Sequence, residues 1–593
     1  MLAVTIGARR PDGSRLKVVA ASQTERRQPL RWRAQGRRVP NVLAALTALF
    51  GLLSLISALA PAQRDRLHEL SALIPAPASA TATALTAAAG VLLLQLARGL
   101  RRRKRRAWRA AVAVLALLVA LHVLKGLDVE EAGLSLVLLV VLVAARAEFQ
   151  AKGDPTTRML ALQAALLLPL IGLVSGMVLV TLYNERLVGD PSIWQQFKHV
   201  LLGLVGIGGP LHFTGERVSE IIAGTLLAFG LLTAFVVSYL ILRPAEPRAV
   251  LTDTDERKLR GLLTAHGCRD SLGYFALRRD KSVVWSPSGK AAICYRVVTG
   301  VALASGDPLG DPEAWPGAIE AFLQLAREHA WTPAVVACGE AAGVAWQRVG
   351  LDALELGDEA VVEVGDFTLQ GRAMRNVRQM VGRVERASYV AQVRRLRDLS
   401  RDEVAGLRSA AAAWRGAQTE RGFSMALGRF GDALDGDCVV VTAHQDGVLR
   451  ALLNFVPWGA DGLSLDLMRR DRTAEPGLNE FLIVRLLETA PGLGVRRVSL
   501  NFAAFRSALE RGERLGAGPV TRLFARVLLF ASRWWQIETL YRFNAKFRPI
   551  WEPRYVCFPT TRDVPRVAVA ALEAEAYLNR PRPFQRLCGR SPF

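Results

Sequence analysis

Six long apolar runs in the first 243 residues limit what this chain can fold into more than any other feature. A run of about 20 residues can cross the hydrocarbon core of a bilayer, about 30 Å thick, as a single helix. We therefore predict a polytopic α-helical membrane domain over 40–243. A shorter run broken by Gly and Pro at 199–213 predicts a re-entrant or interfacial segment. The six runs lie near 42–60, 80–99, 109–125, 132–146, 160–183 and 221–243.

Charged segments between these runs predict their orientation. The N-terminal arm, 1–39, is rich in arginine, and RRRKRR occupies 101–106, whereas GLDVEEAG at 126–133 is acidic. Lys and Arg concentrate on the cytoplasmic side of membrane proteins. We therefore expect the arm, the basic loop and everything beyond Arg243 to lie in the cytoplasm.

The overall charge and the cysteines narrow the function classes. A net charge of +23 favours a partner that carries phosphate, either lipid headgroups or nucleic acid. The six cysteines all lie beyond residue 260 and form no CxxC pair. This spacing predicts reduced thiols in a cytosolic compartment and no zinc site.

The remainder of the chain repeats one pattern of secondary structure. From 273 it predicts the strands YFALRR, SVVWS, AAICYRVV and VALASG, a helix over about 313–329 and the strand PAVVAC. The same order returns with CVVVTAH, VLRALLNFV and LSLDLM, a polar loop RRDRTAEPG, a helix over 478–490 and the strand RRVSLNF. Two such copies predict tandem α+β domains, which we place at 250–365 and 391–580.

A basic segment, 366–390, separates the two copies and is predicted to form a linker helix. At about 100° per residue, apolar side chains fill one arc of this helix and arginines another. Arg binds phosphate oxygens bidentately, so the stripe favours a phosphate-facing surface. A solvated face of an ordinary helix is the alternative. The arginines are Arg372, Arg375, Arg378, Arg383 and Arg386.

One carboxylate stands out in the second copy. In LSLDLM, 463–468, leucines alternate, which predicts a strand that sends Asp466 to the face opposite the leucines. Asp466 is therefore a candidate site residue. A structural ion pair with Arg469 or Arg470 is the alternative.

The returning strand of the second copy offers a further candidate. Its alternation places Ser499 and Asn501 on one face. Parallel strands carry sites at their carboxyl ends, so Asn501 is a candidate hydrogen-bond donor. A satisfied turn or cap residue is the alternative.

Four segments carry a resemblance to known proteins. They are the stretch GDEAVVEVGDFTLQGRAMRNVRQMVGRVERASY, ERGFSMALGRF at 420–430, LSLDLMRR at 463–470 and YRFNAKFRPIWEPRYV at 541–556. Together they resemble the cytosolic catalytic domain of the phosphatidylglycerol aminoacyltransferases, the lysylphosphatidylglycerol synthase family. The resemblance implies a tandem fold like that of the Gcn5-related acetyltransferases, in a multi-pass protein of the bacterial inner membrane. It also implies transfer of an aminoacyl group, foremost lysyl, from aminoacyl-tRNA to phosphatidylglycerol.

The resemblance assigns roles to individual residues. The Asp and Arg of the DLMR strand correspond to the aminoacyl site of the family, and Glu538 is the nearest candidate for its further acidic residue. The lysine and arginines of the C-terminal motif correspond to Lys546, Arg548 and Arg554. The predicted catalytic residues are thus Asp466, Arg469, Glu538 and Lys546, and the predicted substrate-binding residues are Asn501, Arg548, Arg554, Arg372, Arg375 and Arg378.

The chemistry of such a transfer agrees with these residue types. An aminoacyl ester is already activated, so we expect no metal or other cofactor, with aminoacyl-tRNA as co-substrate. A carboxylate among cations, such as Asp466, suits the α-ammonium group, and Arg or Lys can stabilise the developing oxyanion. The expected partners are aminoacyl-tRNA, phosphatidylglycerol and the membrane, and a homo-oligomer stays open.

Two alternative functions would also fit the predicted fold and the basic surface. An acetyl-CoA-dependent acyltransferase would share the fold and needs a Gln/Arg-x-x-Gly-x-Gly/Ala loop for the pyrophosphate. The nearest match is ERLGAG at 513–518, where Glu513 takes the basic position and would repel phosphate. The second alternative is a membrane-anchored RNA- or lipid-binding protein that uses only its basic surface.

Overall fold

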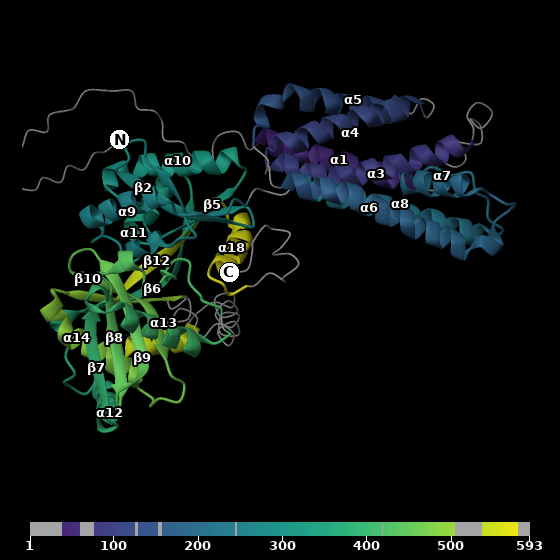
Figure 1. Ribbon diagram of the computed structural model, residues 1–593. Helices are drawn as coiled ribbons and strands as arrows, with labels where there is room; N and C mark the ends of the chain where they lie inside the picture. The colour runs from purple at the N-terminus through teal and green to yellow at the C-terminus, as the bar shows by residue number, and fades with distance from the viewer. Residues whose placement is uncertain are drawn as a thin grey trace, which may run out of the picture.

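The computed structural model describes residues 38–59, 76–124, 129–151, 157–242, 246–417, 419–504 and 537–578. Up to residue 242 these residues form a bundle of helices, and beyond 246 they form an α+β half that lies beside one end of the bundle (Figure 1). The arm before Arg38 and the segment ERLGAG lie outside the described residues.

Long helices stand at the positions of the six predicted apolar runs. Among the described residues, three apolar windows are long enough to cross a membrane, namely Val39–Ile56, Met159–Leu182 and Arg217–Leu240, and a shorter apolar stretch covers Ala132–Ala144. The helical membrane domain is confirmed, while the number of spans stays a prediction. The helices are α1 (Arg38–Leu59), α3 (Ala76–Arg101), α4 (Arg105–Leu124), α5 (Val129–Ala144), α6 (Thr157–Leu182) and α8 (Glu216–Leu242).

Small residues and a buried polar contact hold this bundle together. A Cβ atom on Gly51 of α1 would lie 2.8 Å from the carbonyl oxygen of Gly90 of α3, so only glycine permits this approach. Close backbone packing at small residues is the usual way in which membrane helices associate. Ser238 of α8 also donates a hydrogen bond of 2.8 Å to the side-chain oxygen of Gln95 of α3.

The segment predicted as re-entrant or interfacial, 199–213, is only partly helical. It begins inside the short helix α7 (Ile193–Leu204) and continues as irregular chain to α8. Ser192 and Gln195 form a capping box at the start of α7. Ile193 and Trp194, in the first turn, are 77% and 70% exposed.

The first α+β copy follows helix α9 (Asp253–His266). Its strand β2 pairs antiparallel with both β1 and β3, while β3 and β5 run parallel after a crossover through α10. Its elements are β1 (Ser282–Trp285), β2 (Ala291–Val298), β3 (Val301–Ser305), β4 (Leu309–Gly310), α10 (Trp315–Glu328), β5 (Thr332–Cys338) and α11 (Glu340–Arg348).

The second copy repeats this topology. An antiparallel meander of four strands leads through α14 to β11, which is parallel to β10. The predicted fold of two α+β copies is therefore confirmed. Its elements are β7 (Tyr389–Arg395), α13 (Arg401–Arg415), β8 (Val439–Gln445), β9 (Val448–Trp458), β10 (Gly462–Arg470), α14 (Leu478–Thr489), β11 (Arg497–Ala504), α17 (Ile537–Ala545) and α18 (Val564–Ala574).

Two strands are exchanged between the copies. The strand β6 (Asp352–Glu363) ends the first copy but pairs with β11 of the second, and β12 (Ile550–Phe558) ends the second copy but pairs with β5 of the first. Because β6 and β12 also pair with each other, the described strands form one sheet in the order β1-β2-β3-β5-β12-β6-β11-β10-β9-β8-β7. Figure 1 shows β6 and β12 in the middle of the α+β half.

Two sequence predictions about local structure are wrong. The first four residues of YFALRR, Tyr274–Leu277, belong to a short 3₁₀ helix, Gly273–Leu277, and are all buried, so their apolar character reflects burial rather than strand pairing. The helix predicted over 366–390 is only α12 (Arg375–Arg386), because Gly371 adopts a left-handed conformation with φ of 87° before it. The apolar side chains of α12 pack into the core of the second copy, so α12 is part of that copy and no free linker.

Candidate functional site

The predicted alternation of strand β10 fails at the candidate carboxylate. Leu465 pairs with Phe455 of β9 and Leu467 pairs with Asn454, so Asp466 is the extra residue of a β-bulge. Leu465 is buried in the core beneath α14, whereas Leu467 is buried in the core on the opposite face. The prediction that these two leucines share a face is wrong, because the extra residue resets the alternation.

Two donors hold the carboxylate of Asp466. One oxygen accepts the backbone N–H of Leu427 at 2.6 Å, and the other accepts the side-chain amide of Asn454 at 2.8 Å. Burial raises the pKa of Asp466 to about 6, although both hydrogen bonds act to lower it. The alternative ion pair does not form within the described residues, since Arg469 and Arg470 donate to backbone carbonyls instead.

A cavity of about 200 Å³ lies beside Asp466 over the end of β10. The next residues of the strand, Leu467 and Arg469, line it from one side. Four arginines against one glutamate make the cavity electropositive, and Glu420 itself pairs with Arg415 at 3.1 Å. The charged lining residues are Arg408, Arg415, Glu420, Arg429 and Arg469.

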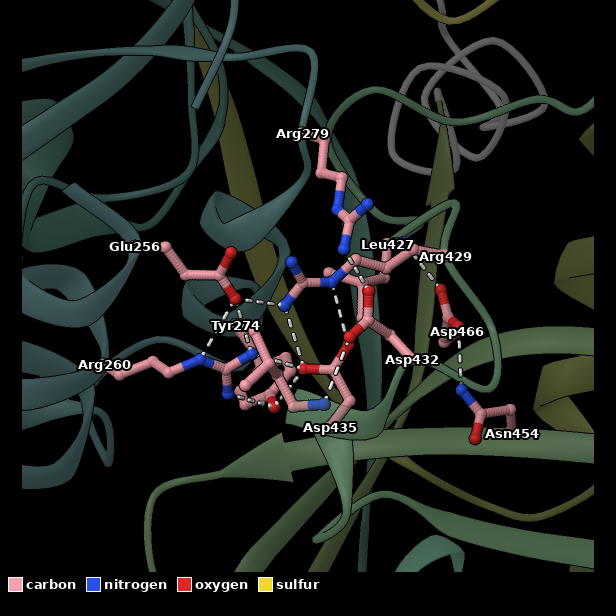
Figure 2. A network of polar contacts seen from close by, with 11 residues as sticks. Glu256, Arg260, Tyr274, Arg279, Leu427, Arg429, Asp432, Asp435, Asn454 and Asp466 are labelled. Carbon is pink, nitrogen blue, oxygen red and sulfur yellow. Dashed lines mark hydrogen bonds and ion pairs between the residues drawn. The ribbon is translucent and has the colours of Figure 1, made fainter. Parts of the chain in front are cut away.

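A balanced network of buried charges fixes the loop that holds Asp466. Arg429 contacts Glu256 of α9 at 2.9 Å and Asp435 at 2.8 Å, and Arg260 of α9 contacts the same two carboxylates. Figure 2 shows this network on one side of Leu427, with Asp466 and Asn454 on the other. Helix α9, which precedes the first copy, thereby helps to position the backbone amide that binds Asp466.

Asn501 lies next to the bulge. Its side-chain amide donates to the carbonyl oxygens of Leu465 and Met425, which links β11 to the bulge and to the 420–430 loop. Asn501 has a φ of 66°, a left-handed conformation that Asn adopts more readily than most residues. Its carbonyl oxygen Oδ1 is buried and has no partner among the described groups.

Arg554 lies elsewhere, inside the exchanged sheet. Its guanidinium contacts Asp270 at 2.8 Å, Glu359 at 2.9 Å and the hydroxyl of Ser271 at 2.7 Å. Burial acts to lower the pKa of Arg554, but Glu359 and Asp270 outweigh it and hold the pKa well above its usual value. These contacts join β12, β6 and the 268–272 loop, and they do not open on the cavity over β10.

The remaining residues of the C-terminal motif are dispersed. Lys546 donates to Glu480 of α14 at 2.7 Å, and Arg548 is exposed in the turn before β12 with a φ of 53°. Glu538 belongs to α17, and its side chain lies outside the described residues. The roles assigned to all three stay predictions.

The arginine stripe is exposed, but the helix that carries it is shorter than predicted. Arg372 precedes α12, and Arg375 and Arg378 lie in its first turns with exposed side chains. The Arg378 side chain donates to the carbonyl of Gly371 at 3.3 Å, and Arg383 forms an ion pair with Glu475. Arg372, Arg375 and Arg386 are exposed and form no side-chain hydrogen bond or ion pair among the described residues, so they are the part of the stripe most accessible to a phosphate backbone.

Several residues around the cavity were not predicted from the sequence. Asn454 is a lone amide in the apolar strand VLRALLNFV, and that mismatch is a signal that could have identified it. Glu420 and Arg429 lie inside the motif ERGFSMALGRF, but nothing in the sequence pairs Arg429 with Glu256. Among the described residues, no group of three or more His, Cys, Asp or Glu side chains is arranged to hold a metal ion.

Comparison with known proteins places this geometry in a family. A family model described as the C-terminal region of phosphatidylglycerol lysyltransferase matches residues 260–558, which is about half of the 593 residues. The chain belongs to this lysyltransferase family. A second model, the transmembrane region of lysyl-tRNA synthetase, matches residues 35–239, so the lysyltransferase-family chain is a membrane protein.

Relatives of the lysyltransferase-family chain include longer proteins. A lysylphosphatidylglycerol biosynthesis bifunctional protein from Rhodococcus opacus is 41% identical over 92% of this chain and 49% of its own length. Its counterpart from Mycobacterium avium is 44% identical over 83% of this chain and 42% of its own length. The chain spans about half the length of the curated relatives it matches. Among solved structures, L-PGS from Bacillus licheniformis is similar over 57% of this chain and 100% of its own, at 22% identity and a TM-score of 0.49.

Proposed function

We propose that this chain transfers an aminoacyl group, foremost lysyl, from aminoacyl-tRNA to phosphatidylglycerol. The glycerol hydroxyl of the lipid attacks the ester carbonyl, a new ester C–O bond forms, and the bond to the tRNA ribose oxygen breaks. The proton of the attacking hydroxyl leaves with the ribose oxygen. The product is a less anionic lipid, which agrees with the names that the longer relatives carry.

The observation that carries the proposal is the β-bulge at Asp466. It places the Asp466 carboxylate, which two hydrogen-bond donors from β9 and the 420–430 loop hold, directly before Leu467 and Arg469, and these two residues line a cavity with three further arginines. A buried carboxylate beside a basic cavity suits the α-ammonium of an aminoacyl ester. Arg469, Arg408 and Arg415 suit phosphate oxygens and a developing oxyanion.

A second carboxylate favours a cationic amino acid over a neutral one. Glu420 lines the cavity itself, and its charge acts on both Asp466 and Arg469. A lysyl group carries two ammonium groups, so two carboxylates would match it. We propose Asp466 for the α-ammonium and Glu420 for the side-chain ammonium.

The proposed setting is the inner membrane of a bacterium. The membrane half would be multi-pass, with the N-terminus and the α+β half in the cytoplasm, where aminoacyl-tRNA is available. RRRKRR at 101–106 lies at the end of the bundle that faces the α+β half, which supports this orientation.

Expression in a bacterial host without aminoacylated lipids tests the proposal. Extracted lipids separated by charge should contain a new amine-positive phospholipid that is less anionic than phosphatidylglycerol. In vitro, ¹⁴C-lysyl-tRNA should label phosphatidylglycerol without ATP. Labelling from ¹⁴C-acetyl-CoA instead, or no labelled lipid from any aminoacyl-tRNA, would overturn it.

A further inference from the structure

A second and larger cavity lies where the helix bundle meets the α+β half. Its volume is about 630 Å³, and both halves line it. The bundle contributes Pro40 and Asn41 of α1 with the end of α3, and the α+β half contributes the end of α10, Trp331 and the start of α18. Figure 1 shows α18 on the side of the α+β half that is turned toward the bundle.

The charge of this junction cavity is strongly unbalanced. Seven arginines line it against one carboxylate, Asp563, which also accepts a hydrogen bond from Thr560 at 2.7 Å. Four of the arginines belong to the bundle and three to the α+β half. They are Arg98, Arg101, Arg102 and Arg103 on one side and Arg327, Arg562 and Arg566 on the other.

Much of this positive charge is uncompensated within the protein. Arg103 pairs with Glu148, but the ion pairs of the described residues include none for Arg101, Arg102 or Arg562. Burial, together with repulsion by Arg102 of the bundle, lowers the pKa of Arg566 to about 10. The two halves therefore bring like charges together, which costs free energy unless an anion lies between them.

The position of the junction cavity favours a lipid phosphate as the anion that it binds. The apolar window of α1 begins at Val39, directly beside the lining residues Pro40 and Asn41. The cavity thus lies at the depth where a bilayer changes from hydrocarbon to headgroups, and arginines at the cytoplasmic surface attract anionic lipids. A tRNA backbone could match the charge, but it would not reach a cavity bounded by the ends of membrane-spanning helices as readily as a lipid phosphate.

We propose that the junction cavity binds the phosphate headgroup of an anionic phospholipid and thereby holds the α+β half against the membrane helices. The lipid phosphate lies between Arg102 and Arg566 and offsets their mutual repulsion. Its acyl chains extend along the bundle beside α1. This site is separate from the cavity over β10, and its occupancy does not depend on aminoacyl transfer.

The side-chain contacts suggest which arginines to change. Arg566 donates to the carbonyl of Thr299 at 2.8 Å and to the hydroxyl of Thr332 at 3.1 Å, so its replacement would also loosen the turn between β2 and β3. Arg102 and Arg562 make no such side-chain contacts among the described residues. The double variant R102Q/R562Q removes charge without removing a structural bond, and R348Q, exposed on α11, is a matched control outside the cavity.

Native mass spectrometry of the full chain in detergent provides the test. The probes are phosphatidylglycerol, phosphatidylcholine, inorganic phosphate and uncharged tRNA, each added separately. We expect retained phosphatidylglycerol on the wild type and on R348Q, little phosphatidylcholine, and retention weakened by about tenfold or more in R102Q/R562Q. Equal retention by the double variant overturns the proposal, as does displacement of the lipid by tRNA. Displacement by millimolar phosphate would identify a free-anion site instead and likewise overturn it.

A D466N variant separates this inference from the proposed function. It should retain lipid at the junction cavity and lose aminoacyl transfer. Lipid retention without any aminoacylated product from the wild type would refute the transfer reaction and leave the junction site standing. If the wild type transfers the aminoacyl group but retains no lipid at the junction cavity, the junction site is refuted and the transfer reaction stands.

Discussion

The side-chain amide of Asn454 on β9 donates a hydrogen bond of 2.8 Å to the carboxylate of Asp466 on β10. The β-bulge at Asp466 shifts the pairing of these two strands by one residue. In a regular ladder without the bulge, Asn454 would pair with Asp466 rather than with Leu467. The bulge therefore keeps Asn454 within hydrogen-bond distance of Asp466 while it takes Asp466 out of the regular pairing of the two strands. Bulges next to active sites commonly redirect a side chain in this way.

The variant D466N should fold and lose transfer. Asn keeps the size of the side chain but removes the negative charge, so we expect aminoacyl-lipid formation to fall by about 100-fold or more. One amide hydrogen would face the Asn454 amide, which costs about 1–3 kcal/mol of stability. Single-turnover transfer and thermal unfolding should be measured together, with D461N, in the β9–β10 turn, as the charge-matched control. Equal activity of the two variants would contradict the role of Asp466.

Stability and activity should both depend on the protonation of Asp466. Its pKa is about 6 in the folded protein against an ordinary value of 3.8, so the folded state keeps the proton longer than the unfolded state. The folded state therefore loses stability relative to D466N as pH rises from about 4 to about 6, and the difference is constant above that window. Transfer by the wild type should rise over the same range as the carboxylate ionises. If the unfolding temperatures of the wild type and D466N change in parallel between about pH 4 and about pH 6, Asp466 does not titrate in this range.

Replacing the hydrogen-bond donor should move that titration. The Asn454 amide acts to lower the pKa of Asp466, so N454L should raise the pH at which transfer reaches half its maximum. The control is T442V, a substitution of similar size at a buried residue of β8 in the same sheet. A profile of N454L that coincides with those of the wild type and T442V would mean that the contact does not tune Asp466.

Arg554 and Arg548 should behave oppositely although they come from one motif. R554M leaves Asp270 and Glu359 buried without their cation, so we expect a loss of about 3–5 kcal/mol in the free energy of unfolding. R548M changes an exposed turn residue and should cost less than about 0.5 kcal/mol. Denaturant titration of the full chain in detergent compares them, and similar midpoints would show that the buried network contributes little.

The arginines at the start of α12 should contribute to tRNA binding. Removing charge in R372Q/R375Q should weaken tRNA binding and lower the slope of log affinity against log salt by about 0.7–0.9 for each phosphate that the protein no longer neutralises. R383Q is the control, because Arg383 already pairs with Glu475. Filter binding across a salt series measures the affinity and the slope for both variants. An unchanged slope in R372Q/R375Q would mean that Arg372 and Arg375 face solvent and do not contact tRNA phosphates.

Local pattern was sufficient for much of the α+β half. Apolar alternation and turn residues predicted the strands that became β8, β9 and β11 within a few residues, because each strand buries one face against a core. The same rule failed at YFALRR, because Tyr274–Leu277 are all buried in a 3₁₀ helix and do not alternate between a buried and an exposed face. It failed again at Leu467, because a bulge depends on how the partner strand pairs and leaves no mark on a single strand.

The sequence by itself determined that helices would occupy the first 243 residues, that two α+β copies would follow, and that Asp466 was a residue of interest. These are consequences of local hydrophobic period and residue chemistry. Only the tertiary structure decided which groups meet, Arg554 with Asp270 and Asn454 with Asp466, and that Arg102 and Arg566 line one cavity between the two halves. The exchange of β6 and β12 was decided in the same way, because pairing between distant segments depends on the packed sheet as a whole and not on any one segment.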